Sequence, residues 1–258
     1  KKEMKNIIDN FKRQIYEGKP VYGPFMKSGD AAFVETTGYA GFEFAILDME
    51  HGPVSLETMQ NNVRAAQIAG MLPIIRVRDH LPESVSQALD IGAGGVQIPQ
   101  ITCAEEAKSA VYAAKYYPKG ERGVCRFVRA ANYSSMDRNE YFKRANDTIL
   151  VLQLEGKEAI ENLDEILSVS GYDILFVGPY DLSQSLGVPG DVTNPLVIAQ
   201  IQNIVVKARE RHIVVGTFLD KLDDLNLWKR LGLQYFCYSV DVGIYYEACK
   251  ELRMQLNC

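Results

Sequence analysis

The sequence contains no apolar run close to the roughly 18 residues that a membrane-spanning helix needs. It also has no excess of positive charge, because 28 lysines and arginines stand against 33 aspartates and glutamates, giving a net charge of −5. A mildly acidic chain offers no basic surface to nucleic acid or to anionic lipid. We therefore expect small-molecule partners, with neither nucleic acid nor membrane bound.

Cysteine is sparse. The odd number of cysteines and their wide spacing argue against a disulfide framework or a cysteine-based zinc site. Free thiols are typical of a reducing compartment, so we expect a cytoplasmic protein. The phosphate-binding GxxxxGKS/T, zinc-binding HExxH and dinucleotide-binding GxGxxG patterns are also missing. The five cysteines are Cys103, Cys125, Cys237, Cys249 and Cys258.

The chain does contain short apolar runs that alternate with segments of helical periodicity. The runs cover residues 21–26, 42–48, 72–77, 94–99, 148–155, 172–178, 213–218 and 235–240. They are nearly continuous in apolar character, as strands of a buried parallel sheet are. Eight such strand–helix units in about 250 residues predict a TIM (β/α)8 barrel. We expect one domain over 1–258, with extra helices over 1–20 and 243–256. A doubly wound open sheet is the alternative fold.

One segment, residues 116–147, is too long for an ordinary connection between a helix and a strand. We expect a functional excursion that contains a short helix. Arg126 and Arg129 lie within it. They have two interpretations: a solvated basic surface, or a bidentate contact to an acidic group on a substrate.

Polar side chains gather where the apolar runs end. In a barrel, catalytic groups lie at the carboxyl ends of the strands, which makes these positions candidates for a site. Each also has a structural interpretation: His51 as a loop residue, Arg76 as an ion-pair partner, and the carboxylates as helix caps. Capping does not explain their convergence from several strands. The residues are Asp48, Glu50 and His51, then Arg76, then Gln153 and Glu155, then Gly178, Tyr180 and Asp181.

The chemistry of these residue types suggests a metal-assisted reaction. Glu155 and Asp181, with no nearby cysteine or paired histidine, suit a hard divalent ion such as Mg²⁺ or Mn²⁺. His51 has an intrinsic pKa close to neutrality and suits general acid–base catalysis. The backbone N–H groups of Tyr180 and Asp181 open a helix and can bind a substrate carboxylate.

Six stretches in order along the chain resemble the HpcH/HpaI aldolases. These are class II pyruvate aldolases acting on 4-hydroxy-2-oxo acids, so the resemblance implies metal-dependent, reversible cleavage to pyruvate and an aldehyde. It also implies a hexamer with exchanged terminal helices. The segment CRFVRAANYS after residue 124 departs from the family and leaves the second substrate open. The stretches are LDMEHGP (47–53), IIRV (74–77), LDIGAGGVQIPQ (89–100), GERGV (120–124), LQLEG (152–156) and VGPYDLSQSLG (177–187).

The resemblance also implies roles for individual residues. Glu155 and Asp181 match the metal ligands, and Arg76 matches the arginine that contacts the pyruvyl oxygens. His51 matches the histidine of the acid–base system. The remaining matches are Asp90, which supports that histidine, and Gln153 and Asp48, which position water or other groups.

Other functions remain open from the sequence. A Schiff-base aldolase needs a lysine within a strand, and no strand core carries one. A glycosidase also uses two carboxylates, but sugar platforms are usually tryptophan-rich and Trp228 is the single tryptophan. A CoA-ester lyase of the citramalyl or malyl type shares the fold and the metal. A catalytically silent metal-binding barrel is the fourth alternative.

Overall fold

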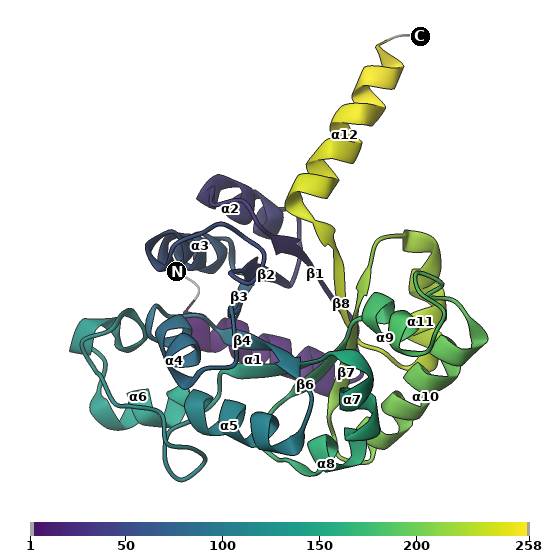
Figure 1. The fold of residues 1–258 in the computed structure, drawn as a ribbon. Helices are drawn as coiled ribbons and strands as arrows, with labels where there is room; N and C mark the ends of the chain where they lie inside the picture. The colour runs from purple at the N-terminus through teal and green to yellow at the C-terminus, as the bar shows by residue number, and fades with distance from the viewer. Residues whose placement is uncertain (1–2, 257–258) are drawn as a thin grey trace.

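A computed structural model describes residues 3–256 and shows a closed barrel of eight parallel strands, ordered β1 to β8 (Figure 1). Because β1 pairs with β8, the sheet has no free edge, and the alternative of an open sheet is wrong. The predicted barrel is confirmed. The strands are β1 (Val21–Met26), β2 (Phe44–Asp48), β3 (Leu72–Arg76), β4 (Gly95–Ile101), β5 (Ile149–Leu154), β6 (Ile174–Val177), β7 (Val214–Leu219) and β8 (Tyr235–Val240).

Most of the helices follow strands and cover the outside of the barrel, whereas α1 precedes β1 and α12 projects away (Figure 1). The helices are α1 (Met4–Tyr16), α2 (Ala31–Tyr39), α3 (Leu56–Ala69), α4 (Pro82–Asp90), α5 (Ala104–Ala114), α6 (Arg138–Ala145), α7 (Gly156–Glu161), α8 (Leu163–Ser168), α9 (Pro179–Ser185), α10 (Pro195–Arg209), α11 (Leu225–Leu231) and α12 (Asp241–Gln255). Two short 3₁₀ segments, η1 (Arg129–Ser134) and η2 (Leu222–Asp224), complete the chain.

The two ends of helix α3 are set by residues suited to begin and end a helix. The Ser55 hydroxyl accepts a hydrogen bond from the Thr58 backbone N–H at 3.2 Å, which satisfies one of the free donors at the start of the helix. The helix ends at Gly70, whose φ of 81° is a left-handed conformation that glycine adopts without a steric penalty.

The strand register aligns polar side chains from three neighbouring strands. Asp48 at the end of β2 is paired in register with Arg76 at the end of β3, and Arg76 is paired with Gln97 on β4. Residues in register on parallel strands share one face of the sheet. The three side chains therefore form a row on the same face of the barrel wall.

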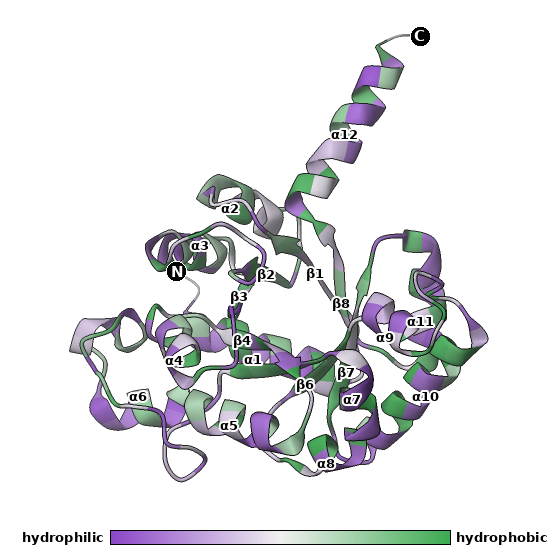
Figure 2. Cartoon of the chain, viewed as in Figure 1, coloured by the Kyte–Doolittle hydropathy of each residue, from purple (hydrophilic) through white to green (hydrophobic). Residues whose placement is uncertain are grey.

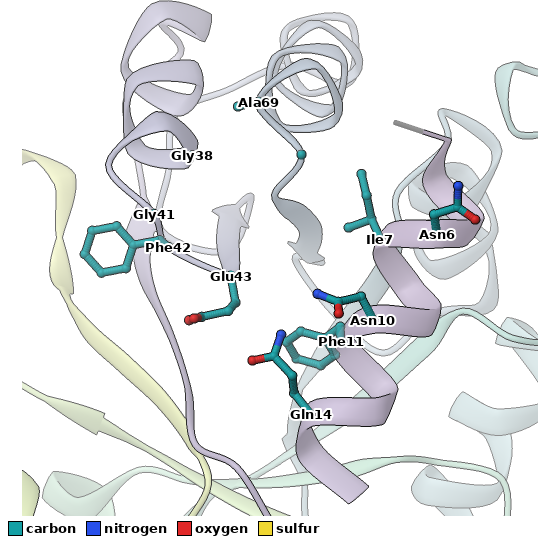
Figure 3. A pocket seen from close by; sticks show the side chains of 11 residues that line it. Asn6, Ile7, Asn10, Phe11, Gln14, Gly38, Gly41, Phe42, Glu43 and Ala69 are labelled. Carbon is teal, nitrogen blue, oxygen red and sulfur yellow. The ribbon is translucent and has the colours of Figure 1, made fainter. Parts of the chain in front are cut away.

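Helix α1 closes the barrel at the amino ends of the strands. Its buried face packs on residues that begin strands, among them Val21, Phe44 and Leu72. A cavity of about 470 Å³ lies between α1 and the turn before β2. Figure 3 shows Asn10 and Gln14 of α1 on one side of this cavity and Glu43 on the other. The cavity thus lies at the opposite end of the barrel from the carboxyl ends of the strands.

The long excursion after α5 also lies at the amino ends of the strands, because it connects the end of α5 to the start of β5. It contains the expected short helix, α6. Tyr116 and Tyr141 pack together in a small hydrophobic cluster of its own. Asn132, Tyr133 and Ser134 all have positive φ values, of 49°, 54° and 75°. The excursion therefore has a small hydrophobic cluster of its own and lies on the return side of the barrel.

Helix α12 extends away from the barrel (Figure 1). At its start, Asp241 accepts hydrogen bonds from the backbone N–H groups of Lys27 and Ser28, which tie the helix to the end of β1. Figure 2 shows hydrophobic and hydrophilic residues interleaved along the projecting part. Exposed apolar side chains of this helix are Val242, Ile244, Tyr245, Tyr246 and Leu252.

Within residues 3–256, no helix is both long enough and apolar enough to cross a membrane. The thiols of Cys103, Cys125, Cys237 and Cys249 are free, as expected. Cys258, the fifth expected free thiol, lies outside the described residues.

Candidate active site

The site is built around a buried ion pair at the ends of β2 and β3. Arg76 donates from Nε to Asp48 Oδ1 at 2.8 Å and from Nη2 to Asp48 Oδ2 at 2.7 Å. Burial alone would raise the pKa of Asp48, but the hydrogen bonds and charge of Arg76 hold the pKa below its usual value. The guanidinium lies 4.6 Å from the centre of the Phe25 ring. Both side chains are thus charged and fixed.

Glu50 is a site residue to which sequence reasoning assigned no role. Its Oε2 lies 3.0 Å from Arg76 Nη1 and 3.9 Å from His51 Nε2. The side chain of His51 is 61% exposed, so it faces the solvent side of this cluster. The sequence did indicate where Glu50 would lie, because it follows the end of the same strand as Asp48. The structure therefore places Glu50 between Arg76 and His51.

A second group of polar residues follows β5. Gln153 donates from Nε2 to Glu155 Oε1 at 2.6 Å, so the two side chains lie on the same face of the strand as expected. Burial raises the pKa of Glu155, and the negative charges of Glu50 and then Asp181 raise it further. Gln153 and the backbone N–H of Gln100 partly oppose this shift. Glu155 thus sits in an environment that favours a nearby positive charge.

Gly178, Tyr180 and Asp181 surround the start of α9, directly after β6. A Cβ at Gly178 would lie 2.7 Å from Asp181 Oδ2, so glycine leaves the space that this carboxylate occupies. Because α9 begins at Pro179, the N–H groups of Tyr180 and Asp181 have no acceptor within the helix. The Tyr180 hydroxyl donates to Asp220, and this hydrogen bond raises the pKa of Tyr180 to about 12.

The donor set fits a divalent cation with few protein ligands. Glu155 and Asp181 follow neighbouring strands, and the charge of Asp181 acts on Glu155. Among residues 3–256, no group of three or more histidine, cysteine, aspartate or glutamate side chains has the arrangement of a metal cage. Two carboxylates without thiols suit an oxygen-preferring ion that keeps open positions for other oxygen ligands.

Three expected residues lie away from this cluster. Asp90 ends α4, at the far end from the loop that carries His51, and pairs with Arg122. Arg129 donates to the carbonyl of Ile91 and to Gln67 Oε1. Arg126 donates to the carbonyls of Ser134 and Met136. Within one chain, Asp90 therefore does not reach His51, and both arginines bind their own surroundings on the return side of the barrel.

The amino-acid sequence is similar to those of proteins of known activity. The chain is 33% identical over 236 residues to a 2-dehydro-3,6-dideoxy-6-sulfogluconate aldolase from Pseudomonas putida, covering 91% of this chain and 92% of the relative. It is 32% identical over 251 residues to a 2-keto-3-deoxy-L-rhamnonate aldolase from Escherichia coli, covering 96% and 93%.

A solved structure of an HpcH/HpaI aldolase/citrate lyase family protein from Burkholderia cenocepacia superposes with a TM-score of 0.89 at 28% identity, covering 96% of this chain and 99% of the other. The predictions of an aldolase-type carbon–carbon lyase and of its family agree with these findings. The HpcH/HpaI aldolase/citrate lyase family profile matches residues 22–248, and the chain belongs to this family.

Proposed function

We propose that this protein is a divalent-metal-dependent lyase that reversibly cleaves a 4-hydroxy-2-oxo acid to pyruvate and an aldehyde. The observation that supports it most is the cluster at the strand ends: the charges of Asp181 and Glu50 act on Glu155, and Glu50 lies 3.0 Å from Arg76. The similar curated proteins are named as aldolases of 2-keto-3-deoxy acids, which supports the same substrate class. We further propose that 1–258 acts as one domain, in the cytoplasm.

Glu155 and Asp181 would hold the ion, with Mg²⁺ or Mn²⁺ as the expected metals. When bound, the ion supplies a Lewis acid for the 2-oxo oxygen of the substrate. Gln153 occupies one oxygen of Glu155 and leaves the other for the cation. The substrate carboxylate binds near Gly178, at the free N–H groups of Tyr180 and Asp181.

Arg76 stabilises the negative charge that develops on the 2-oxo oxygen when the C3–C4 bond breaks. Asp48 and Glu50 hold the guanidinium from two sides, so it needs no reorganisation during the reaction. The bonding electrons pass to the three-carbon fragment as an enolate. Protonation of that enolate at C3 then gives pyruvate.

His51 accepts the proton of the C4 hydroxyl as the aldehyde forms, either directly or through a water molecule. Its exposed position beside Glu50 suits this role. Asp90, matched by resemblance to a supporting aspartate, pairs with Arg122 in its own chain. Support of His51 by Asp90 therefore requires Asp90 from another copy of the chain.

We propose a homo-oligomer, a hexamer by family resemblance. Helix α12 is about 22 Å long at 1.5 Å per residue and exposes apolar side chains that water solvates poorly. A second copy is the occupant that the resemblance implies. Light scattering should show a multiple of the chain mass, and Tyr246→Glu or Leu252→Glu should lower it. A monomeric wild type would contradict this proposal.

The test of the function is pyruvate release from 4-hydroxy-2-oxo acids, measured with a coupled dehydrogenase. EDTA should abolish release, and added Mg²⁺ or Mn²⁺ should restore it. Turnover that survives EDTA but is lost after borohydride treatment with pyruvate would indicate a Schiff-base aldolase instead. Cleavage of citramalyl-CoA or malyl-CoA alone would favour the CoA-ester lyase, and no turnover with either class would favour the silent barrel.

A further inference from the structure

Gln97 of β4 is fully buried in the barrel wall and contacts the candidate metal site through one intermediate residue. Its Nε2 donates to Gln153 Oε1 at 2.6 Å, and Gln153 Nε2 donates in turn to Glu155 Oε1 at 2.6 Å. Two amides thus form a continuous hydrogen-bonded chain from the interior of the barrel to a carboxylate at its rim.

The donor and acceptor order of these hydrogen bonds follows from the carboxylate of Glu155, at which they end. An ionised carboxylate only accepts hydrogen bonds, so Gln153 must turn its NH2 group towards Glu155. The carbonyl oxygen of Gln153 then faces inward and needs a donor, which Gln97 supplies. If Gln97 could not donate, the inward-facing oxygen of Gln153 would lose its donor, and the Gln153 amide would be held only from the Glu155 side.

Packing of the barrel wall does not explain why a glutamine lies at position 97. Its Oε1 is buried and has no hydrogen-bond partner among the described residues. A buried acceptor without a partner destabilises a fold, because it loses its hydrogen bonds to water and gains none in return. An aliphatic side chain in the same wall would avoid that loss, so the contribution of Gln97 lies in its donor.

We propose that Gln97 is a positioning residue for the metal centre of the proposed function. It holds the Gln153 amide in the one orientation that donates to Glu155. The carboxylate is thereby held in place, with one oxygen engaged and the other left for the cation. This inference rests on the proposed function, because Glu155 must be a metal ligand for the orientation to matter.

The test measures Mn²⁺ affinity without substrate, by the loss of the free-ion electron paramagnetic resonance signal. Gln97→Met keeps the length of the side chain and removes both polar atoms. We expect its Kd for Mn²⁺ to rise by about 10- to 100-fold, the usual effect of losing a group that orients a metal ligand. If circular dichroism shows that Gln97→Met does not fold, the same measurement is made on Gln97→Leu.

A double-mutant cycle distinguishes positioning from a general packing defect. If Gln97 acts through Gln153, the change Gln97→Met should have almost no effect in a Gln153→Met background. Thr217→Val is the matched control: it removes a buried hydroxyl that donates to the Val177 carbonyl, outside this chain of amides. The control should bind Mn²⁺ as the wild type does.

Three outcomes would overturn the assignment. The first is wild-type Mn²⁺ affinity in Gln97→Met and Gln97→Leu, and the second is an equal loss in the Gln153→Met background. The third is an equal loss in Thr217→Val. In all three the wild type binds Mn²⁺, so the proposed function stands. A wild type that binds no Mn²⁺ would contradict the proposed function itself, and this assignment with it.

Discussion

Asp48 and Arg76 form a two-pronged ion pair across the ends of neighbouring strands, with N–O distances of 2.8 and 2.7 Å. Such a fork fixes the plane of the guanidinium as well as its position. Glu50 Oε2 lies 3.0 Å from Nη1 and adds a second carboxylate to the same guanidinium. The pair therefore makes a rigid cation from a flexible side chain.

The first prediction follows from this geometry. Arg76→Lys should lower kcat by at least about 100-fold, because a point charge cannot copy a planar fork and one oxyanion partner is lost. Steady-state kinetics of pyruvate release gives the measurement. Near-wild-type rates in Arg76→Ala would show that the arginine is structural.

The second prediction concerns acid stability. The lowered pKa of Asp48 means that its contribution to stability is complete above the unfolded-state pKa of about 3.9 and is lost as pH falls through the folded value. Asp48→Asn should therefore be less stable than the wild type by about 3–5 kcal/mol at pH 7, the scale of a broken buried pair. The difference should shrink below about pH 4. Urea unfolding at several pH values measures it, and a difference independent of pH would refute the linkage.

The third prediction concerns the metal. Glu155→Gln and Asp181→Asn should each remove tightly bound divalent metal and pyruvate release together, because a neutral amide replaces a charged oxygen ligand poorly. Metal content after dialysis, compared with the wild type, is the readout. Metal-dependent turnover in both variants would contradict the ligand assignment.

The fourth prediction concerns the base. His51→Ala should slow cleavage by on the order of 10²–10⁴, the range of general base catalysis. Exchange of the pyruvate C3 protons, followed by nuclear magnetic resonance, should suffer less, because a water molecule can serve in that step. Normal cleavage by the variant would reduce His51 to a loop residue.

The fifth prediction separates the two interpretations of the excursion. Because Arg126 and Arg129 donate to backbone carbonyls, Arg126→Ala and Arg129→Ala should each lower the free energy of unfolding by about 1–3 kcal/mol. The ratio of kcat/KM for glyoxylate to that for a neutral aldehyde, with pyruvate, should not change. A drop in that ratio of about 10-fold or more, equivalent to a lost charged contact, would show that the excursion recognises acidic aldehydes.

The strands could be predicted because both of their faces are buried, and burial makes each run almost continuously apolar. The helices could be predicted from their caps and periodicity, as α3 shows. The last helix begins at Asp241 rather than at 243 because the carboxylate accepts the N–H of Val242 and those of the β1 loop.

The site was harder to predict where it depends on register. Glu50 meets Arg76 only because β2 and β3 pair with Asp48 opposite Arg76. Gln97 stands within an apolar run, and a neutral amide gives no sign of chemistry until its neighbours across the sheet are known. The position of Asp90 away from His51 could be predicted in part. Asp90 lies two residues before Gly92, at the end of α4, and the end of a helix lies on the return side of a barrel.

Helix α12 is connected to the loop after β1, at the carboxyl ends of the strands. The structure of that loop should therefore depend on the protein concentration. If copies of the chain associate through α12 as proposed, dilution to single chains should make α12 fray along its exposed part, because an isolated helix of this length is marginal in water. Asp241 is the first residue of that helix and also the acceptor for the Lys27 and Ser28 N–H groups. Fraying that reached Asp241 would release the loop after β1, close to Phe25, on which Arg76 rests. Specific activity should then fall as the enzyme is diluted below its dissociation constant.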